Sequence, residues 1–591
     1  MQKNKYWIGI NSSHNSSVAI MDHSGKIIFA LQEERLSRNK NHWSLPVKSI
    51  KKAIEIVHGW ENIEKIIFAG IVHPATDKNI SRDDIKSGIL SVIGQKKSLK
   101  SFISKKKHIF EINLNQKKYL QNNIKKFKKN HINIFRKNFP EVKDNPIEFV
   151  EHHDTHFATA SFGGLEAFKK DLLIFTYDGQ GDGLCGTVSI LRSNGVVENL
   201  HKIQDQNSLS TLYGFTTFYL GLTIFEHEYK LMGMAPYASY SRSLLIKNKL
   251  KELYKCEDKG WVLKNKLRYV DIDESKFYKE IENIYKLERF DEICLGVQLL
   301  VEEFLTQWVS FWINKTGVND IALSGGMFLN VKANLKLMEL NSVNSIYIFP
   351  SCGDETNCIG ALYYKYFINK NKPPKPITSM GLGQAIESEN IEKEIYNYIS
   401  ENKLNYKVDI KENIEDEVAE LLSIGEIVGR VEGKEEFGAR ALGNRSILAN
   451  PSNWEAISKI NDMIKKRDFW MPFAASILDK CYEKYVQDPK KINAEYMIMS
   501  FKCTDHIKDI IAGTHPKDKT VRPQIVRKKT NPSYYKIIDS FYKKTGIGAV
   551  LNTSLNLHGY PLASSVNNAM EVLQFSELKY LAISKYLIKK V

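Results

Sequence analysis

Three segments of the chain repeat one order, in which an apolar run leads into a glycine-containing turn. They are "DLLIFTYDGQGD" (171–182), "DIALSGGMFLNVKANLKLMEL" (320–340) and "SIYIFPSCGDETNCIGALYYKYF" (345–367). In the last two segments, apolar residues at helical spacing follow directly after the turn. Strands that alternate with helices in this way predict an α/β layered fold.

Short apolar runs at the start of the chain predict strands at 6–11, 17–22 and 26–34. Helical spacing predicts a helix at 45–60, which ends at a Gly-Trp pair, and a long apolar helix at 293–317. The pattern of alternating elements restarts late in the chain, with a helix at 412–424, a strand at 426–431, a Gly/Arg-rich turn at 433–445, and strands near 496–501, 523–528 and 548–553.

A chain of 591 residues is too long for one hydrophobic core, so two or more domains are expected. The stretch "NKNKPPKPITSMGLGQ" (369–384) collects proline, glycine and polar residues and is the best linker candidate. We therefore expect one domain over 1–375 and a second α/β domain over 376–591.

The cysteine pattern and the apolar runs bear on the compartment. Seven cysteines, sparse and without a C-x-x-C pair, fit free thiols in a reducing cytosol, so a cytoplasmic protein is expected. No apolar run reaches the length of a membrane span, and the start turns polar too soon for a secretory signal peptide. No membrane is expected among the partners.

The chain is basic, with a formal net charge of +16. This balance suggests polyanionic partners, although a global bias toward lysine would give the same excess with no partner at all. An inserted helical hairpin or cap is expected at about 81–145, and its stretch 96–139 is rich in lysine. The alternative is a solvated helical surface.

The segment "EHHDTH" (151–156) sets three histidines and two further acids within six residues, in a chain with only 15 histidines. His152 and His156 stand four apart, so on a helix they share one face and suit a transition metal. A satisfied helix-surface pair is the competing interpretation. Asp354, in a loop after a later strand, could complete a set of two histidines and one carboxylate with open positions.

Turns after strands can offer backbone N–H groups and hydroxyls to a phosphate. Three such turns, at 9–22, 177–182 and 323–330, favour a nucleotide bound in a cleft, while the competing interpretation is turn geometry only. The candidate nucleotide-binding residues are Asn11, Ser12, Ser13, Asp178, Gly179, Gly181, Asp182, Gly325, Gly326 and Asn330.

Positive charge gathers among glycines in "EGKEEFGARALGNRSILANP" (432–451), where guanidinium groups would match phosphate oxygens. Downstream segments add polar groups that suit a small anionic substrate with amide character, and a basic surface face is the alternative. The candidates are Lys434, Arg440, Arg445, His515, Arg522, Gln524, Asn552, Ser554 and Asn556.

With these segments the sequence resembles the O-carbamoyltransferase family of nodulation-factor and antibiotic carbamoyltransferases, over nearly the whole chain except roughly 81–145. The motifs are G-x-x-x-x-H-x-x-S-x-A at 9–19, E-H-H-x-x-H at 151–156, D-G-x-G-D at 178–182, E-Y-K-x-M-G-x-A-P-Y at 228–237, G-G-x-x-L-N at 325–330, E-F-G-x-R-A-L-G-N-R-S at 436–446 and L-N-T-S-x-N at 551–556.

The resemblance implies a duplicated, actin- and sugar-kinase-like N-terminal domain, similar to the tRNA threonylcarbamoyl-transfer protein. It implies a C-terminal domain similar to threonylcarbamoyl-adenylate synthase. The second domain would make carbamoyl-adenylate from carbamoyl phosphate and ATP, and the first would carbamoylate an acceptor hydroxyl. By the same resemblance, a divalent metal, iron(II) before magnesium or manganese, would sit on His152, His156 and Asp354.

The resemblance also assigns catalytic residues: His14 as the general base at the acceptor site, with Lys230, Arg440 and Arg445. Substrate contacts would come from Lys434, His515, Arg522, Asn552, Ser554 and Asn556. His153 is expected to be structural or to support the metal ligands. Four positions depart from the family pattern, namely Asn15, Lys434, Ala439 and Met471. Two positions that could bind phosphate, around 434 and 471, are thereby weakened.

The acceptor is open between two classes. One is a hydroxymethylated base in DNA, such as 5-hydroxymethylcytosine, favoured by the net charge and by Lys-rich segments interleaved with Phe102, Phe110, Phe127 and Phe135. The other is a hydroxyl of a sugar, polyketide or other small natural product. A nucleotide-binding regulator without catalysis is a third hypothesis, because a fold does not fix function. A homodimer is left open.

Overall fold

The computed structural model describes residues 5–72, 84, 116–142, 144–264, 274–387, 389–465, 468–492 and 494–591. The chain divides into two compact units, with the main division between Ile377 and Thr378, inside the expected linker. The first unit holds Met1–Ile28 and Asn41–Ile377, and the second holds Phe29–Lys40 and Thr378–Val591. The segment Phe29–Lys40 thus packs with the second unit, although its sequence position would place it in the first domain.

A five-stranded sheet has the order β3-β2-β1-β4-β5, and apart from the part of β3 from Phe29 on, its strands belong to the first unit. Its central strand β1 is antiparallel to β2 and parallel to β4, which is parallel to β5. The strands are β1 (Tyr6–Asn11), β2 (Ser17–Asp22), β3 (Ile27–Gln32), β4 (Ile63–Ala69) and β5 (Ile147–Val150). The strand expected over 26–34 ends at Gln32, and helix α1 (Glu33–Ser37) follows it.

A second five-stranded sheet in this unit has the order β12-β11-β6-β7-β8. Here β6 is antiparallel to β7 and parallel to β11, which is parallel to β12. The two sheets therefore share one topology, as the expected duplication requires. The strands are β6 (Leu172–Gly181), β7 (Leu184–Leu191), β8 (Val197–Gln204), β11 (Asp320–Ser324) and β12 (Ser345–Ile348).

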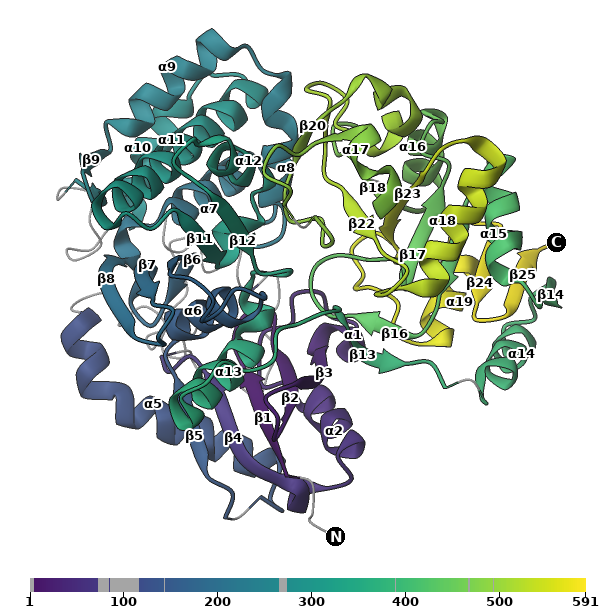
Figure 1. The fold of residues 1–591 in the computed structure, drawn as a ribbon, viewed down its shortest axis with the longest axis horizontal. Helices are drawn as coiled ribbons and strands as arrows, with labels where there is room; N and C mark the ends of the chain where they lie inside the picture. Colours follow the sequence, from purple (N-terminus) through teal and green to yellow (C-terminus); the bar gives the residue numbers. More distant parts are fainter. Residues whose placement is uncertain are drawn as a thin grey trace. The chain divides into compact units, whose positions relative to one another are not determined.

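Two helices, α6 (His152–Phe162) and α13 (Asn357–Lys370), pack on each other between the two sheets (Figure 1). Helix α6 follows the last strand of the first sheet but packs on β6 and β11 of the second. Helix α13 follows the last strand of the second sheet but packs on β1 and β4 of the first. They cross closely at Gly360, which has no side chain: a Cβ at this position would lie 2.2 Å from the carbonyl oxygen of Thr155.

The remaining helices of the first unit surround these layers. The longest of those described, α11, is followed by Gly317, which caps the helix with a φ of +71°, in the left-handed conformation that glycine favours. The elements are α2 (Val47–Ile56), α7 (Leu209–Tyr219), α8 (Glu228–Met234), α9 (Tyr240–Lys251), α10 (Glu274–Tyr285), α11 (Phe290–Thr316), α12 (Val331–Glu339), β9 (Tyr254–Glu257) and β10 (Gly260–Leu263).

The described part of the insert is one helix, α5 (Gln116–Asn138), which contains no acidic residue. Its side chains Phe127 and Phe135 are buried, and the Phe135 ring lies 5.6 Å from that of Phe68 in the first sheet. These two phenylalanines are therefore not available to stack on bases, contrary to the expectation. Phe102 and Phe110 lie outside the described residues.

The second unit is built on an eight-stranded mixed sheet in the order β14-β25-β24-β15-β17-β23-β18-β22. The strands are β14 (Tyr406–Ile410), β15 (Val428–Val431), β17 (Arg445–Ala449), β18 (Ala474–Leu478), β22 (Gln524–Val526), β23 (Ala549–Ser554), β24 (Tyr580–Ile583) and β25 (Tyr586–Lys590). Two smaller sheets comprise β13 (Gly381–Ala385) with β16 (Lys434–Glu436), and β19 (Val486–Gln487) with β20 (Phe501–Cys503) and β21 (Thr520–Val521).

Helices cover this sheet in two packed pairs, α14 with α19 and α15 with α18. The apolar residues of α14 and α19 form one core cluster with β15, β17, β23 and β24. The helices are α14 (Ile391–Glu401), α15 (Ile414–Ser423), α16 (Glu455–Ile460), α17 (Tyr482–Tyr485), α18 (Pro532–Thr545) and α19 (Val566–Gln574). Across the described residues of both units, no helix is long and apolar enough to cross a membrane.

Candidate metal and transfer site

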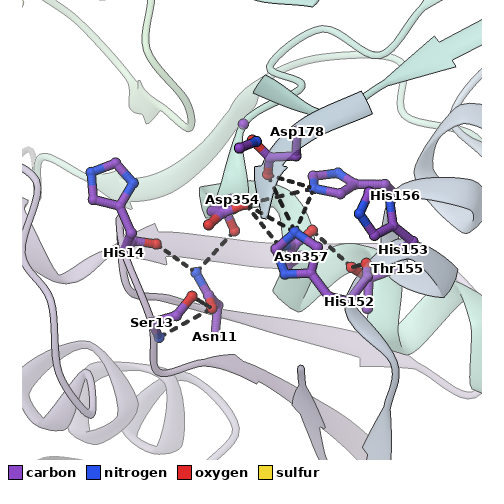
Figure 2. A network of polar contacts seen from close by, with 12 residues as sticks. Asn11, Ser13, His14, His152, His153, Thr155, His156, Asp178, Asp354 and Asn357 are labelled. Carbon is purple, nitrogen blue, oxygen red and sulfur yellow. Dashed lines mark hydrogen bonds and ion pairs between the residues drawn. The ribbon is translucent and has the colours of Figure 1, made fainter. Parts of the chain in front are cut away.

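The polar cluster of the first unit forms where strand ends and helix starts of both sheets meet. His152 is the first residue of α6, and His156 follows one turn later. Asp178 lies just past the last pairing of β6 with β11, and Asp354 lies in the loop between β12 and α13. Figure 2 shows the four side chains converging, with His153 turned away from them.

The ligating atoms of these four residues all lie within 4.8 Å of one another. Asp178 Oδ2 is 3.2 Å from His152 Nε2 and 3.3 Å from His156 Nε2. Asp354 Oδ1 is 3.5 Å from each of the same nitrogens. The two Nε2 atoms are themselves 3.2 Å apart. The predicted three-residue set is therefore brought together, and Asp178 joins it as a fourth member.

Neighbouring polar groups fix the orientation of the cluster. The Ser324 hydroxyl is 3.3 Å from His156 Nδ1, so that Nε2 points to the centre. Asn357 Nδ2 donates to Asp354 Oδ1 at 3.2 Å, and the Asn357 amide oxygen accepts from the Thr155 hydroxyl at 2.8 Å. Supporting bonds of this kind are what hold metal ligands in place in known sites.

Asp182 and His153 have structural uses. The Asp182 carboxylate accepts backbone N–H bonds from Ile71, Val72 and His152, the last at 2.8 Å, and so fixes the start of α6. His153 is buried, with Nδ1 2.8 Å from the Thr176 hydroxyl and Nε2 3.1 Å from the Leu184 carbonyl. The Asp182 carboxylate is thus engaged with backbone, its contact with a nucleotide stays a prediction, and the His153 ring holds α6 against the second sheet.

The loop after β1 is tied to the cluster through Asn11. Asn11 Nδ2 donates to the carbonyl oxygens of Asp354 at 2.9 Å and of His14 at 3.0 Å. Its amide oxygen accepts from the Ser13 hydroxyl at 2.7 Å. The His14 ring lies to one side of the cluster (Figure 2). Asn11 and Ser13 therefore shape the turn that carries His14, and Ser12, also buried, is part of the same turn.

The cluster carries strongly shifted charges. Burial alone would lower the pKa of His152, but the carboxylates of Asp354 and Asp178 raise it to about 10. Burial together with the charge of Asp178 raises the pKa of Asp354 to about 6. Burial opposes ionisation of Asp178, yet hydrogen bonds from His152 and His156 hold its pKa well below the usual range. The carboxylate pair thus favours a positive charge between the histidines.

The donor set fits a divalent metal ion. Separations of 3.2–3.5 Å between Nε2 and carboxylate oxygens are those of ligand atoms around one first-row ion, whose bonds to nitrogen and oxygen are about 2.0–2.2 Å. Two imidazoles and two carboxylates suit iron, manganese or zinc better than magnesium. His152 and His156 are fully buried, so a cation there would have lost most of its water to these side chains.

Glycines near the cluster serve close packing. A Cβ on Gly181 would lie 2.1 Å from the His152 ring, and a Cβ on Gly325 would lie 2.2 Å from the Tyr177 carbonyl. A Cβ on Gly326 would lie 2.8 Å from Asp178 Oδ1, whereas one on Gly179 would meet nothing within 4 Å. Asn330, a further nucleotide candidate, caps α12 by accepting from the Ala333 N–H at 3.0 Å.

In the second unit, the Gly/Arg-rich loop is fixed from both sides. Glu436 Oε1 accepts the backbone N–H groups of Leu442, Asn444 and Arg445, at 2.7, 2.6 and 3.2 Å. The amides of two strand residues donate to the same loop: Gln524 to the Leu442 carbonyl at 2.8 Å, and Asn552 to the Ala441 carbonyl at 3.2 Å. Asn552, a predicted substrate contact, therefore positions this loop.

Arg445 does not have the environment expected of a phosphate-binding residue. It is 0% exposed, and its guanidinium donates to the carbonyl oxygens of Glu432, Asn444 and Gly433 at 2.9–3.1 Å. Its charge is thus used to hold the ends of the loop together. The guanidinium thus forms an internal latch within the Gly-Asn-Arg segment, and the catalytic role of Arg445 stays a prediction.

Arg440 and Arg522 remain on the surface of this loop region, both half-buried. Arg440 precedes Leu442 by two residues, and Arg522 precedes Gln524 by two residues. Because the Gln524 side chain donates to the Leu442 carbonyl, the backbones of the two arginines are held near each other. Lys434 is exposed. His515 is buried, with Nδ1 accepting the Lys517 N–H at 3.2 Å, so its ring shapes a turn.

Lys465 is a polar residue of this unit that the sequence did not single out. It is 2% exposed, and its Nζ donates to the Ser554 hydroxyl at 3.2 Å and to the Asn556 carbonyl at 3.0 Å. Two predicted substrate contacts, Ser554 and Asn556, therefore bind this ammonium. Its sequence surroundings, "SKINDMIKKRD" (458–468), are rich in charged and polar residues and give no signal that this lysine is buried.

Lys230 lies on α8, half-buried, in the first unit. Its helix begins at Glu228, whose Oε1 accepts the Phe225 N–H at 2.6 Å. Burial raises the pKa of Glu228 to about 7. No distance places Lys230 at the histidine cluster, so its catalytic role stays a prediction.

Two family models match most of the chain: Carbamoyltransferase N-terminus over residues 6–363 and Carbamoyltransferase C-terminus over residues 419–590. Nodulation protein NolNO of Sinorhizobium fredii is 27% identical over 98% of this chain and 80% of its own length. An uncharacterized protein of Methanocaldococcus jannaschii, MJ1058, is 26% identical over 98% of each chain. A 3'-hydroxymethylcephem-O-carbamoyltransferase of Amycolatopsis lactamdurans is 34% identical over 24% of this chain and 27% of its own. The chain therefore belongs to the carbamoyltransferase family of transferases.

Proposed function

We propose that this enzyme is an ATP-dependent O-carbamoyltransferase that works in two steps. The second unit makes carbamoyl-adenylate from carbamoyl phosphate and ATP, and the first unit transfers the carbamoyl group to an acceptor hydroxyl. The observation that carries the proposal is the buried cluster of His152, His156, Asp178 and Asp354 at the strand ends of the duplicated unit. Ligands bind at such strand ends in open α/β sheets.

The two steps balance as follows. Water attacks carbamoyl phosphate and releases inorganic phosphate, which leaves carbamate. A carbamate oxygen attacks the α-phosphorus of ATP, forms a C–O–P link, and pyrophosphate leaves. In the transfer, the acceptor oxygen attacks the carbamoyl carbon, AMP leaves, and the hydroxyl proton passes to a base. Carbamate alone is a poor electrophile, and the adenylate gives it a good leaving group.

Three cations of the second unit support the first step. Arg440 and Arg522 are half-buried beside a loop whose backbone is fixed by side chains, which suits bidentate contacts to phosphate oxygens. Lys465 is buried and already bound to backbone and side-chain oxygens, so it holds the Ser554–Asn556 turn in place. Arg445 acts only through the position of the loop.

For the second step, His14 is the proposed base that receives the proton of the acceptor hydroxyl. Its loop is bound through Asn11 to the backbone of Asp354, so the base and the cluster are held in one frame. A divalent metal held by the four cluster residues would neutralise charge on the leaving phosphate. Imidazole ligands favour iron(II) or manganese over magnesium in this role.

For the acceptor, helix α5 supports the DNA hypothesis in part. Lys125, Lys126 and Lys129 are exposed on a helix with no acidic residue, which suits phosphate contacts. The burial of Phe127 and Phe135 removes base stacking from that hypothesis. A hydroxymethylated base in DNA and a small-molecule hydroxyl therefore both remain candidate acceptors. In the DNA hypothesis, α5 would bind the strand only through contacts between its lysines and the phosphates.

The first test is release of pyrophosphate by the full-length enzyme with carbamoyl phosphate and ATP, with carbamoyl phosphate omitted as the control. The variant His156→Ala should retain this release, because the second unit is untouched, and should lose metal and transfer. The absence of pyrophosphate release in the wild type, or full transfer by His156→Ala with no bound metal, would refute the proposal.

A further inference from the structure

Three rings meet at the loop that carries the proposed base. The His14 ring centroid lies 5.5 Å from that of Trp43 and 5.7 Å from that of Phe225, and the Trp43 and Phe225 rings meet edge to face at 6.2 Å. They come from three separate segments: the turn after β1, the loop that precedes α2, and the loop that precedes α8.

Hydrogen bonds join these segments. The Ser16 N–H donates to the His42 carbonyl at 2.9 Å, which links the His14 turn to the Trp43 loop. Asn41 Nδ2 donates to the Phe225 carbonyl at 3.3 Å, and the Phe225 N–H donates to Glu228 Oε1 at 2.6 Å. The backbone of Phe225 is thus held on both sides.

Phe225 combines two unfavourable properties. Its φ is +63°, in the left-handed region that bulky side chains rarely adopt. Its side chain is also 46% exposed, so its contacts with the His14 and Trp43 rings leave much of its aromatic surface uncovered. Strained residues that the surroundings hold in place are frequent at ligand-binding sites.

Phe168 provides the contrast within the same unit. Its φ is +64°, but its ring packs on Phe162 and Phe367, at 6.5 and 5.9 Å between centroids. The strain at Phe168 is therefore explained by packing within the protein. The Phe225 ring has similar ring contacts, with His14 and Trp43, but it stays half-exposed beside His14.

We infer that Phe225 and Trp43 hold the acceptor, and that the acceptor is a compound whose hydroxyl is carried on, or one carbon from, a ring. This inference rests on the proposed function, because it takes His14 as the base. A ring that lies against Phe225 would cover the exposed aromatic surface and place its hydroxyl beside the His14 imidazole. A flat nucleobase and the apolar face of a sugar ring share this chemistry.

The test uses the full-length enzyme with carbamoyl phosphate, ATP and three acceptors: 5-hydroxymethyl-2'-deoxycytidine, methyl β-glucopyranoside and the acyclic 1,3-propanediol. The wild type should carbamoylate a ring compound with a higher kcat/KM than the diol, and the ring compound used identifies the source. Phe225→Ala should raise the KM for that compound about 10-fold with little change in kcat, since stacking on an aromatic ring is lost. Phe225→Tyr should restore the KM.

Two controls separate the outcomes. Phe225→Gly should also raise the KM while its melting temperature stays equal or rises, because glycine accepts a φ of +63°. Phe168→Leu should lower the melting temperature and leave the KM unchanged. An unchanged KM in both Phe225→Ala and Phe225→Gly, or wild-type transfer to the diol alone or to none of the three, would overturn the inference. Pyrophosphate release, measured in each case, reports separately on the proposed function.

Discussion

Gly181→Ala should empty the metal site without unfolding the protein. The backbone of Gly181 is not in the left-handed region, so alanine is allowed there, but its Cβ would lie 2.1 Å from the His152 ring. Restoring an ordinary contact of 3.4 Å requires the ring to move by about 1.3 Å. Ligand distances tolerate only about 0.2 Å, so Nε2 would leave the cluster and metal affinity should fall about 100-fold or more.

The matched control is Gly179→Ala, two residues away, whose Cβ would meet nothing within 4 Å. Both variants are purified without nucleotide, and their metal content and affinity are measured by elemental analysis and competition with a chelator. Pyrophosphate release reports on the second unit, which should be unaffected. Wild-type metal affinity in Gly181→Ala would refute the assignment of His152. An equal loss of metal affinity in both variants would instead indicate that both glycines are needed for the close approach of a bound ligand.

Three further results are expected. Arg440→Lys should slow pyrophosphate release about 10-fold, because one ammonium cannot make a two-pronged phosphate contact. Arg445→Lys should mainly lower the melting temperature, because it removes a buried guanidinium that holds the loop together. Thermal unfolding and pyrophosphate release are measured for both variants, and equal melting temperatures would contradict this contrast. If DNA is the acceptor, replacing the exposed α5 residues Lys125, Lys126 and Lys129 by glutamine should make the plot of log affinity against log salt less steep. The slope should change by about 0.9 for each phosphate that is no longer neutralised. An unchanged slope in a binding titration would show that α5 does not contact DNA. Burial raises the pKa of Glu228 from 4.5 to about 7, so between these pH values the folded protein holds a proton that the unfolded chain releases. The free energy of unfolding therefore falls as pH rises through this window, by at most about 3 kcal/mol. Glu228→Gln should flatten that fall in denaturant titrations at pH 5 and pH 8.

The sequence predicted elements well where burial is local. The apolar run at 171–182 became β6, over Leu172–Gly181, because a buried strand shows as continuous apolar residues. The run at 496–501 did not become a strand, since Met497 has a φ of +56° and β20 begins only at Phe501. A left-handed residue that tertiary packing imposes leaves no signal in an apolar run.

Site residues were predictable where their type is rare and their spacing regular. His152 and His156 satisfy both conditions. Asp178 was assigned to a nucleotide instead, because a D-G-x-G-D motif contains two aspartates and its sequence does not say which one faces the cluster and which one binds backbone. The surroundings of Arg445 were not predictable: its charge suggested an exposed cation, while its full burial goes with hydrogen bonds to the Glu432 and Gly433 carbonyls.

The duplication explains why one place in the first unit holds both a cation-binding cluster and a base. Each half brings the end of its first strand and the start of its last helix to the space between the sheets. The first strands lead to Asn11 in one half and to Asp178 in the other, while His152 starts the last helix of the first half and Asp354 lies in the loop before the last helix of the second. The amide of Asn11 binds two carbonyls and shapes the proposed acceptor loop, whereas the carboxylate of Asp178 draws positive charge between the histidines.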